Sequence, residues 1–197
     1  MSVKPSMLDG LKNGFAILQV KRNCQKRFLS LEALGIEVPD IRDYNVVYTA
    51  DYGEKEKNLD DPKRLKSYLE NIFYIFNVNH PEGFTGHSLS VSDIVAVIRN
   101  GEVSYYFVDS IGFVELVGFG KPIIQIGDFK CYLVDEWEGC GEKFQFGSYP
   151  TCDLVFYFSL TKPSGIDLEY DFRPTRDEVE DYWINEIAAL DIAAHDC

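Results

Sequence analysis

The sequence contains little of what a membrane protein, a disulfide-rich protein or a zinc protein needs. No apolar stretch in its 197 residues approaches the roughly 20 residues that span a bilayer. The segment Met1–Leu18 lacks the basic flank, apolar block and small-residue cleavage site of a signal peptide. The five cysteines form no Cys-x-x-Cys pair, and His80, His87 and His195 are widely spaced. We therefore expect a cytoplasmic protein with reduced thiols, no metal site, no cofactor and no membrane contact.

Basic residues are also scarce. The chain has 19 Lys and Arg against 32 Asp and Glu, which gives a net charge of −13. Residues 1–120 carry 16 acidic and 13 basic side chains, net −3, whereas residues 121–197 carry 16 and 6, net −10. Nucleic-acid backbones bind basic surfaces, so we expect no direct nucleic-acid binding. An acidic surface suits a basic protein partner, or it only keeps the protein soluble.

What the sequence does contain is enough apolar material for a core, with 46% hydrophobic and 14% aromatic residues. Its patterns predict an α+β fold with a mainly antiparallel sheet. Asn100-Gly101 favours a tight hairpin between two apolar strands, 94–98 and 103–108. We place a domain boundary at Gly118-Phe119-Gly120, where the charge changes, giving regions 1–119 and 120–197. The second region has its own expected strands and either packs on the same core or forms an independent domain.

Two prominent helices are expected. Asp61 can cap a helix over 62–76, in which Pro62 occupies the first position. Leu65, Leu69, Ile72, Phe73 and Phe76 would form its apolar face. Near the C-terminus, Thr175 and Glu178 form a capping box for a helix over 175–190. The acidic second region therefore ends in a helix.

The segment 135–150 reads as a Gly-rich acidic loop. Its carboxylates and those of the last helix are the candidate partner-binding residues, with Trp137, Phe144, Phe146 and Tyr149 as aromatic contact area. In the alternative interpretation the aromatic rings pack locally and the carboxylates are only solvated. If the segment is a loop, reversing Asp135, Glu136 and Glu138 to Lys would weaken binding and leave the fold intact. The proposed partner-binding set is Asp135, Glu136, Trp137, Glu138, Glu142, Asp177, Glu178, Glu180 and Asp181.

The first region resembles the YodL-like domain over about residues 14–119. The resemblance rests on five segments: 15–20, 27–36, 43–50, 76–95 and 106–113. It includes the runs NHPEGFTGHSLSVSDIV and YFVDSIGF. The family occurs in integrative, conjugative and phage-like elements of Firmicutes, which implies an accessory protein of mobile DNA, often encoded beside anti-restriction proteins. It implies no catalytic residues. The region after Gly120 is unassigned.

The polar residues of this motif allow two interpretations. As a hydrolase, His87 would act as a base on Ser88 or Ser110, oriented by a carboxylate. As a structural loop, the same Ser, Asp and His side chains would bond the backbone where the chain enters a strand. No nucleophile elbow, phosphate loop or dinucleotide fingerprint is present. We favour the structural interpretation and expect no enzyme. The motif-loop residues are His87, Ser88, Ser90, Asp93, Asp109 and Ser110.

The sequence therefore leads to a functional hypothesis. We expect a non-enzymatic counter-defence inhibitor, anti-CRISPR or anti-restriction, which mimics DNA and binds the basic nucleic-acid-binding surface of a host defence nuclease. One alternative is an interaction module that targets a host housekeeping protein, such as the cell-shape or division machinery. The other is a hydrolase that uses His87 and Ser88.

Overall fold

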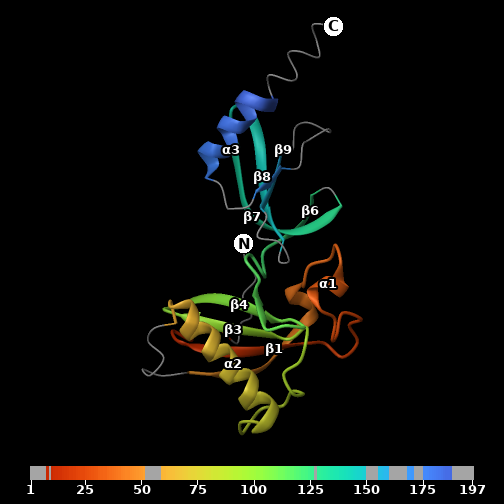
Figure 1. Ribbon diagram of the computed structural model, residues 1–197, viewed down its shortest axis with the longest axis vertical. Helices are drawn as coiled ribbons and strands as arrows, with labels where there is room; N and C mark the ends of the chain where they lie inside the picture. The colour runs from red at the N-terminus through yellow and green to blue at the C-terminus, as the bar shows by residue number, and fades with distance from the viewer. Residues whose placement is uncertain are drawn as a thin grey trace, which may run out of the picture.

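The computed structural model describes residues 8, 10–51, 59–126, 128–149, 155–159, 168–170 and 175–187 (Figure 1). Its strands form two five-stranded sheets, in the orders β2-β1-β3-β4-β5 and β10-β9-β8-β7-β6. Every strand pair is antiparallel, which confirms the predicted α+β fold. Within the described residues, no helix has the length and apolar character needed to cross a bilayer.

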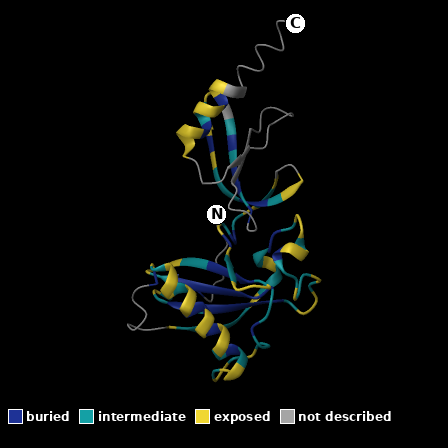
Figure 2. Cartoon of the chain, in the orientation of Figure 1, coloured by how far each residue is buried: buried dark blue, intermediate teal, exposed yellow. Residues whose placement is uncertain are grey.

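The first sheet is apolar on both faces at its centre. Ile17, Val95 and Val97 pack with helix α2 on one side, whereas Ala16 and Ala96 belong to the cluster on the other side. This explains why β1 and β3 read as continuous apolar runs (Figure 2). The elements of this part are β1 (Gly14–Val20), α1 (Leu31–Leu34), η2 (Ile41–Asp43), β2 (Tyr44–Ala50), α2 (Pro62–Val78), β3 (Ile94–Arg99), β4 (Glu102–Val108) and β5 (Phe113–Glu115).

Helix α2 begins and ends where the sequence predicts. The Asp61 side chain accepts a hydrogen bond from the Lys63 N–H at 2.9 Å, and Pro62 is the first helical residue. The helix is capped at Asn79, ahead of Pro81. The predicted apolar face is wrong at one residue. Phe73 is 39% exposed, whereas Tyr68, which the prediction did not include, is buried.

The predicted hairpin at Asn100-Gly101 is confirmed. Both residues have positive φ, 52° and 85°, and Arg99 pairs with Glu102 across the turn. This is the backbone geometry that an Asn-Gly pair adopts at little cost. It sets β3 and β4 in the register that gives the sheet its two apolar faces.

The second sheet contains the largest departure from the sequence-based expectation. The expected acidic loop 135–150 is mostly strand, and the chain turns at Cys140-Gly141, where both residues have positive φ. Helix α3 lies along this sheet (Figure 1) and begins with the predicted capping box. Positions 188–190 of the expected helix lie outside the described residues. The elements are β6 (Ile123–Ile126), β7 (Phe129–Gly139), β8 (Glu142–Ser148), β9 (Val155–Ser159), β10 (Leu168–Tyr170), α3 (Arg176–Tyr182) and η4 (Trp183–Ile187).

Alternation along β7 explains why the segment is a strand. Trp137 stacks on Phe144 of β8 with ring centroids 5.1 Å apart, and Val179 and Trp183 of the C-terminal helix join the same cluster. The neighbouring Glu136 points to the opposite face, because side chains alternate along a strand. Acidic residues between apolar ones are therefore the solvent-facing half of a β-strand.

Tyr132 of β7 joins the two sheets. Its ring is 1% exposed and belongs to the same core cluster as Phe107, Tyr105 and Phe119 of the first part. Its hydroxyl donates a hydrogen bond to the Pro39 carbonyl oxygen at 2.7 Å. Burial raises the pKa of this hydroxyl well above its usual value, so it remains a donor.

We expect Tyr132→Phe to lower the free energy of unfolding by about 1–3 kcal/mol, because the substitution leaves a buried carbonyl oxygen without its donor. Urea denaturation measures the effect. Tyr74→Phe, at a tyrosine that is 61% exposed, is the matched control and should leave stability unchanged. Equal stabilities of the two variants would contradict this role for the Tyr132 hydroxyl.

Candidate functional site

The motif loop 86–93 is held against β1 by one side chain, Gln19, which is 4% exposed. Its Oε1 accepts a hydrogen bond from the His87 N–H at 3.0 Å. Its Nε2 donates to the His87 carbonyl oxygen at 2.8 Å and to Asp93 Oδ2 at 3.0 Å. Both amide protons are thus used. Gly86 permits this approach, because a Cβ there would overlap Gln19 Oε1.

Asp93 lies under this loop and is fully buried. Its Oδ2 also accepts a hydrogen bond from the Ser90 N–H at 2.9 Å, whereas Oδ1 accepts none from the described residues. Burial raises the pKa of Asp93 to about 7, against the opposing effects of the Ser90 N–H, the Gln19 amide and the Arg27 charge. The side chain is a structural anchor that carries a partial charge at neutral pH.

His87 does not form the predicted pair with the Ser88 hydroxyl. Its Nδ1 lies 2.7 Å from the Ser88 carbonyl oxygen and 3.1 Å from Gln19 Nε2, so its contacts are with a backbone carbonyl and the Gln19 amide. Ser88 Oγ lies instead 3.3 Å from His80 Nε2. Ser90 Oγ donates to the Ser88 carbonyl oxygen at 2.8 Å. These contacts match the structural interpretation of the loop, in which polar side chains bond the backbone.

A second segment, missed by the sequence reasoning, covers this loop. The Phe28 N–H donates to Ser92 Oγ at 2.9 Å, and the Phe28 ring lies 5.4 Å from the His87 ring, centroid to centroid. Phe28 and Ser92 both have positive φ, 65° and 78°, which costs free energy for non-glycine residues. The Arg27 guanidinium sits 4.5 Å over the Phe28 ring. One sequence signal was available: Gln19 is a lone polar residue in the apolar strand β1.

Asp109 and Ser110 belong to a different group of contacts. Asp109 Oδ1 accepts hydrogen bonds from the Leu31 N–H at 3.2 Å and from the Ser110 N–H at 2.8 Å. This carboxylate therefore supports the start of α1 and the turn after β4. The structure brings His87, Ser90 and Asp93 together, but Asp109 and Ser110 line a separate cavity beside α2.

Four of the eight predicted partner-binding carboxylates are already engaged in contacts within the second part of the chain. Asp135 forms a two-point ion pair with Arg176, with N–O distances of 2.7 and 2.8 Å. Glu136 pairs with Lys143 at 3.2 Å. Glu178 completes the α3 capping box, and Glu180 accepts a hydrogen bond from the indole N–H of Trp137 at 2.8 Å. The premise of the triple reversal, that Asp135, Glu136 and Glu138 lie in a loop, is wrong, because all three belong to strand β7.

Trp137 is not an exposed anchor. It is 8% exposed, it lies between Phe144 and Arg176, and its indole N–H is bonded. Phe144, Phe146 and Tyr149 are buried as well. Trp137, Phe144 and Phe146 thus form the local core, as the alternative interpretation held, whereas Tyr149 belongs to the core cluster that includes the first sheet.

The remaining exposed carboxylates lie on two faces. Glu138 shares the face of Glu136, opposite the face that α3 covers. Asp177 and Asp181 are exposed on α3 itself and form no ion pair with other described residues. Glu142 is the first residue of β8, and its side chain lies outside the described set. The predicted acidic set is therefore not one continuous patch.

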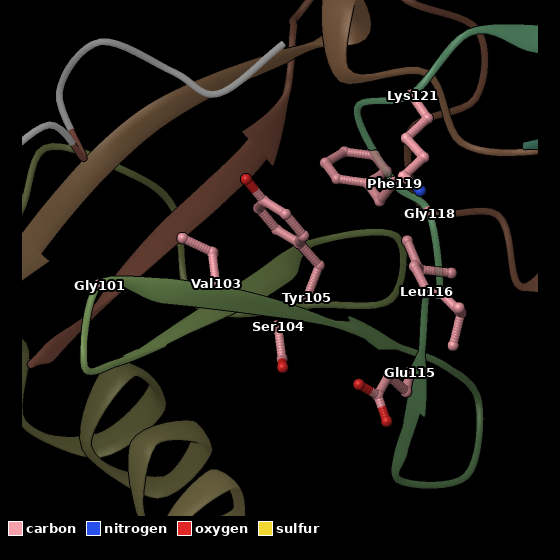
Figure 3. Close-up of a pocket in the computed structure, with 10 residues that line it drawn as sticks. Gly101, Val103, Ser104, Tyr105, Glu115, Leu116, Gly118, Phe119 and Lys121 are labelled. Atoms are coloured by element: carbon pink, nitrogen blue, oxygen red, sulfur yellow. The ribbon is translucent and has the colours of Figure 1, made fainter. Parts of the chain in front are cut away.

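A groove of about 400 Å³ follows β4 and the chain that leaves β5 (Figure 3). Val103 and Tyr105 point to one side of β4 and Ser104 to the other, and Glu115 and Lys121 supply its charges. None of the motif-loop residues lines it. It offers no paired acid and base, so its geometry suggests no catalytic centre.

Asp93→Asn tests the anchor. The carboxyl has a higher pKa in the folded protein than its ordinary value near 4, so the folded state binds more protons between the two values. The free energy of unfolding should therefore fall as pH rises through this range. Asn cannot ionise, so its stability relative to wild type should increase from pH 4 to 8, by up to about 4 kcal/mol. Urea denaturation at each pH measures this, and a constant difference would contradict the assignment.

Comparison with known proteins gives one match. The model of the YodL-like domain family matches residues 14–119. No curated protein and no solved structure matches the chain. The match covers both the first sheet and the motif loop, including the anchor residues Gln19 and Asp93. Because it spans more than half of the sequence, the chain belongs to the YodL-like domain family.

Proposed function

We propose that this protein is a non-enzymatic accessory protein of a mobile genetic element, a counter-defence inhibitor of the anti-restriction or anti-CRISPR kind. Its acidic second part binds a basic nucleic-acid-binding surface of a host nuclease. The observation that carries the proposal is the exposed face of α3, where Asp177 and Asp181 make no ion pair with other described residues, in a region of net charge −10.

The geometry of α3 favours such a contact. Asp177 and Asp181 are four residues apart, so they lie on the same side of the helix, about 5–6 Å apart at Cβ. Arg176, the one basic residue of α3, is paired with Asp135 of β7. The helix is fixed to the sheet by Val179 and Trp183. The two carboxylates are therefore presented on a rigid support, as a mimic of backbone phosphates requires.

The contacts of the motif loop support the non-enzymatic part of the proposal. The Ser88 hydroxyl forms no hydrogen bond with His87, and His87 Nδ1 lies against the Ser88 carbonyl oxygen and the Gln19 amide. Asp93 Oδ2 lies 3.7 Å from His87 Nδ1, beyond hydrogen-bonding distance, and is bonded instead to the Gln19 amide and the Ser90 N–H. A hydrolase built on His87 and Ser88 would need a different arrangement.

The α3 surface is tested by the double reversal Asp177→Lys/Asp181→Lys, with inhibition of DNA cleavage as the measurement. The probes are purified host restriction endonucleases and CRISPR effector nucleases. We expect the reversal to weaken inhibition at least about tenfold, mainly through slower association, and high salt to have a similar effect on the wild type.

The matched control is Glu82→Lys/Glu102→Lys, which changes the net charge equally at two exposed glutamates of the first part. This control should keep most of the inhibition. Equal losses in both double variants would mean that only net charge matters. Inhibition of none of the nucleases, together with capture of a cytoskeletal or division protein, would favour the housekeeping alternative.

Ser88→Ala tests the absence of hydrolase chemistry in the loop. The Ser88 hydroxyl contacts only His80 among the described residues, so its removal should change neither stability nor inhibition measurably. The same cleavage assay measures this, with thermal unfolding as the control for folding. A folded Ser88→Ala protein that has lost its biological effect would revive the hydrolase alternative.

A further inference from the structure

A cavity of about 370 Å³ lies between helix α2 and the turn that joins β4 to β5. Its walls are mostly apolar. Phe73 comes from the helix, whereas Val108 and Phe113 come from the two strands. The Phe73 and Phe113 rings meet edge to face at 6.4 Å, so the wall is a fixed surface rather than a loose gap. The α3 surface takes no part in it.

Apolar side chains at the cavity are also exposed on the outer surface. Ile111, between two residues that line the cavity, is 92% exposed. Phe73, which lines the cavity itself, is 39% exposed. The fold does not require an isoleucine at Ile111, because the turn depends on Gly112, whose φ is 75°. Grouped exposed apolar residues of this kind mark interaction surfaces.

The charges around the cavity have one sign. Glu70 and Asp109 line it, and no basic residue does. Glu70 is 60% exposed and only 3.9 Å from Lys66, a weak surface pair. Asp109 uses Oδ1 for two backbone N–H groups. An apolar hollow with two carboxylates at its border is complementary to an apolar side chain that has a cationic neighbour.

We propose that this groove binds a segment of a partner protein in which a large apolar side chain is flanked by Arg or Lys. The apolar side chain enters the cavity between Phe73 and Phe113, and the flanking cations meet Glu70 and Asp109. Ile111 covers the segment outside the cavity. The apolar surface beyond the cavity is the reason to assign a protein segment rather than a small molecule. The groove is a second binding surface, separate from the α3 surface. The proposal for it does not depend on the proposed function.

The test uses three short synthetic peptides and the intact chain. One has a central Leu-Trp pair flanked by Arg, the second has Glu in place of Arg, and the third has Ser in place of Leu-Trp. Backbone amide NMR should show shifts around Phe73, Val108 and Phe113 with the first peptide only. Ile111→Ser removes the apolar side chain without adding charge and should weaken this binding about tenfold or more. Val117→Ser, at an exposed valine that does not line the cavity, is the matched control and should leave the binding unchanged.

Glu70→Arg provides the charge-reversal arm, since it should shift the preference toward the Glu-flanked peptide. Shifts mapped elsewhere, equal binding of the first two peptides, or no binding of any peptide would overturn the proposal. These peptides do not involve the nuclease, and Ile111→Ser should leave nuclease inhibition intact. Failure here is therefore distinguishable from failure of the α3 surface.

Discussion

The buried carboxylate of Asp93 and its amide partner Gln19 are the constraint on which the first half of the molecule depends. A carboxylate removed from water is unfavourable unless it is hydrogen-bonded, and Gln19 and the Ser90 N–H supply those bonds. The same amide holds both backbone groups of His87. The loop between α2 and β3 is thereby tied to β1. The end of α2 and the beginning of β3 are fixed by one polar centre inside an apolar sheet.

The anchored side chains of the motif differ from the surface beside them. His87, Ser90 and Asp93 contact backbone groups or Gln19, whereas the surface at Ile111 and Phe73 is apolar and exposed. The second part divides its roles in another way. Trp137 and Trp183 form its core with Val179, and several carboxylates bond neighbouring elements. On the outer side of α3, Asp177 and Asp181 form no ion pair with other described residues. Both proposed surfaces thus lie on rigid elements that the buried contacts support.

Local rules predicted much of this fold. Asp61-Pro62, Asn100-Gly101 and the Thr175/Glu178 pair each specify a geometry by themselves, so α2, the β3–β4 hairpin and the start of α3 were predictable. The strand β7 was not, because its glutamates raised the polarity of a segment whose alternation was the relevant signal. The Gln19–Asp93 contact joins positions 74 residues apart, and no local pattern encodes such a pair. For the same reason, the distribution of the acidic residues over two faces could not be predicted without the strand register of the sheet.

In the function that we propose, the protein acts through outward-facing side chains and the motif loop 86–93 supports the fold. Hydrogen–deuterium exchange of the intact chain, alone and with a nuclease that it inhibits, tests this claim most directly. We predict that the nuclease slows amide exchange across α3 and the strand beside it and leaves the exchange of residues 86–93 unchanged. Protection centred on residues 86–93, with α3 unaffected, would contradict it and make the loop the functional surface.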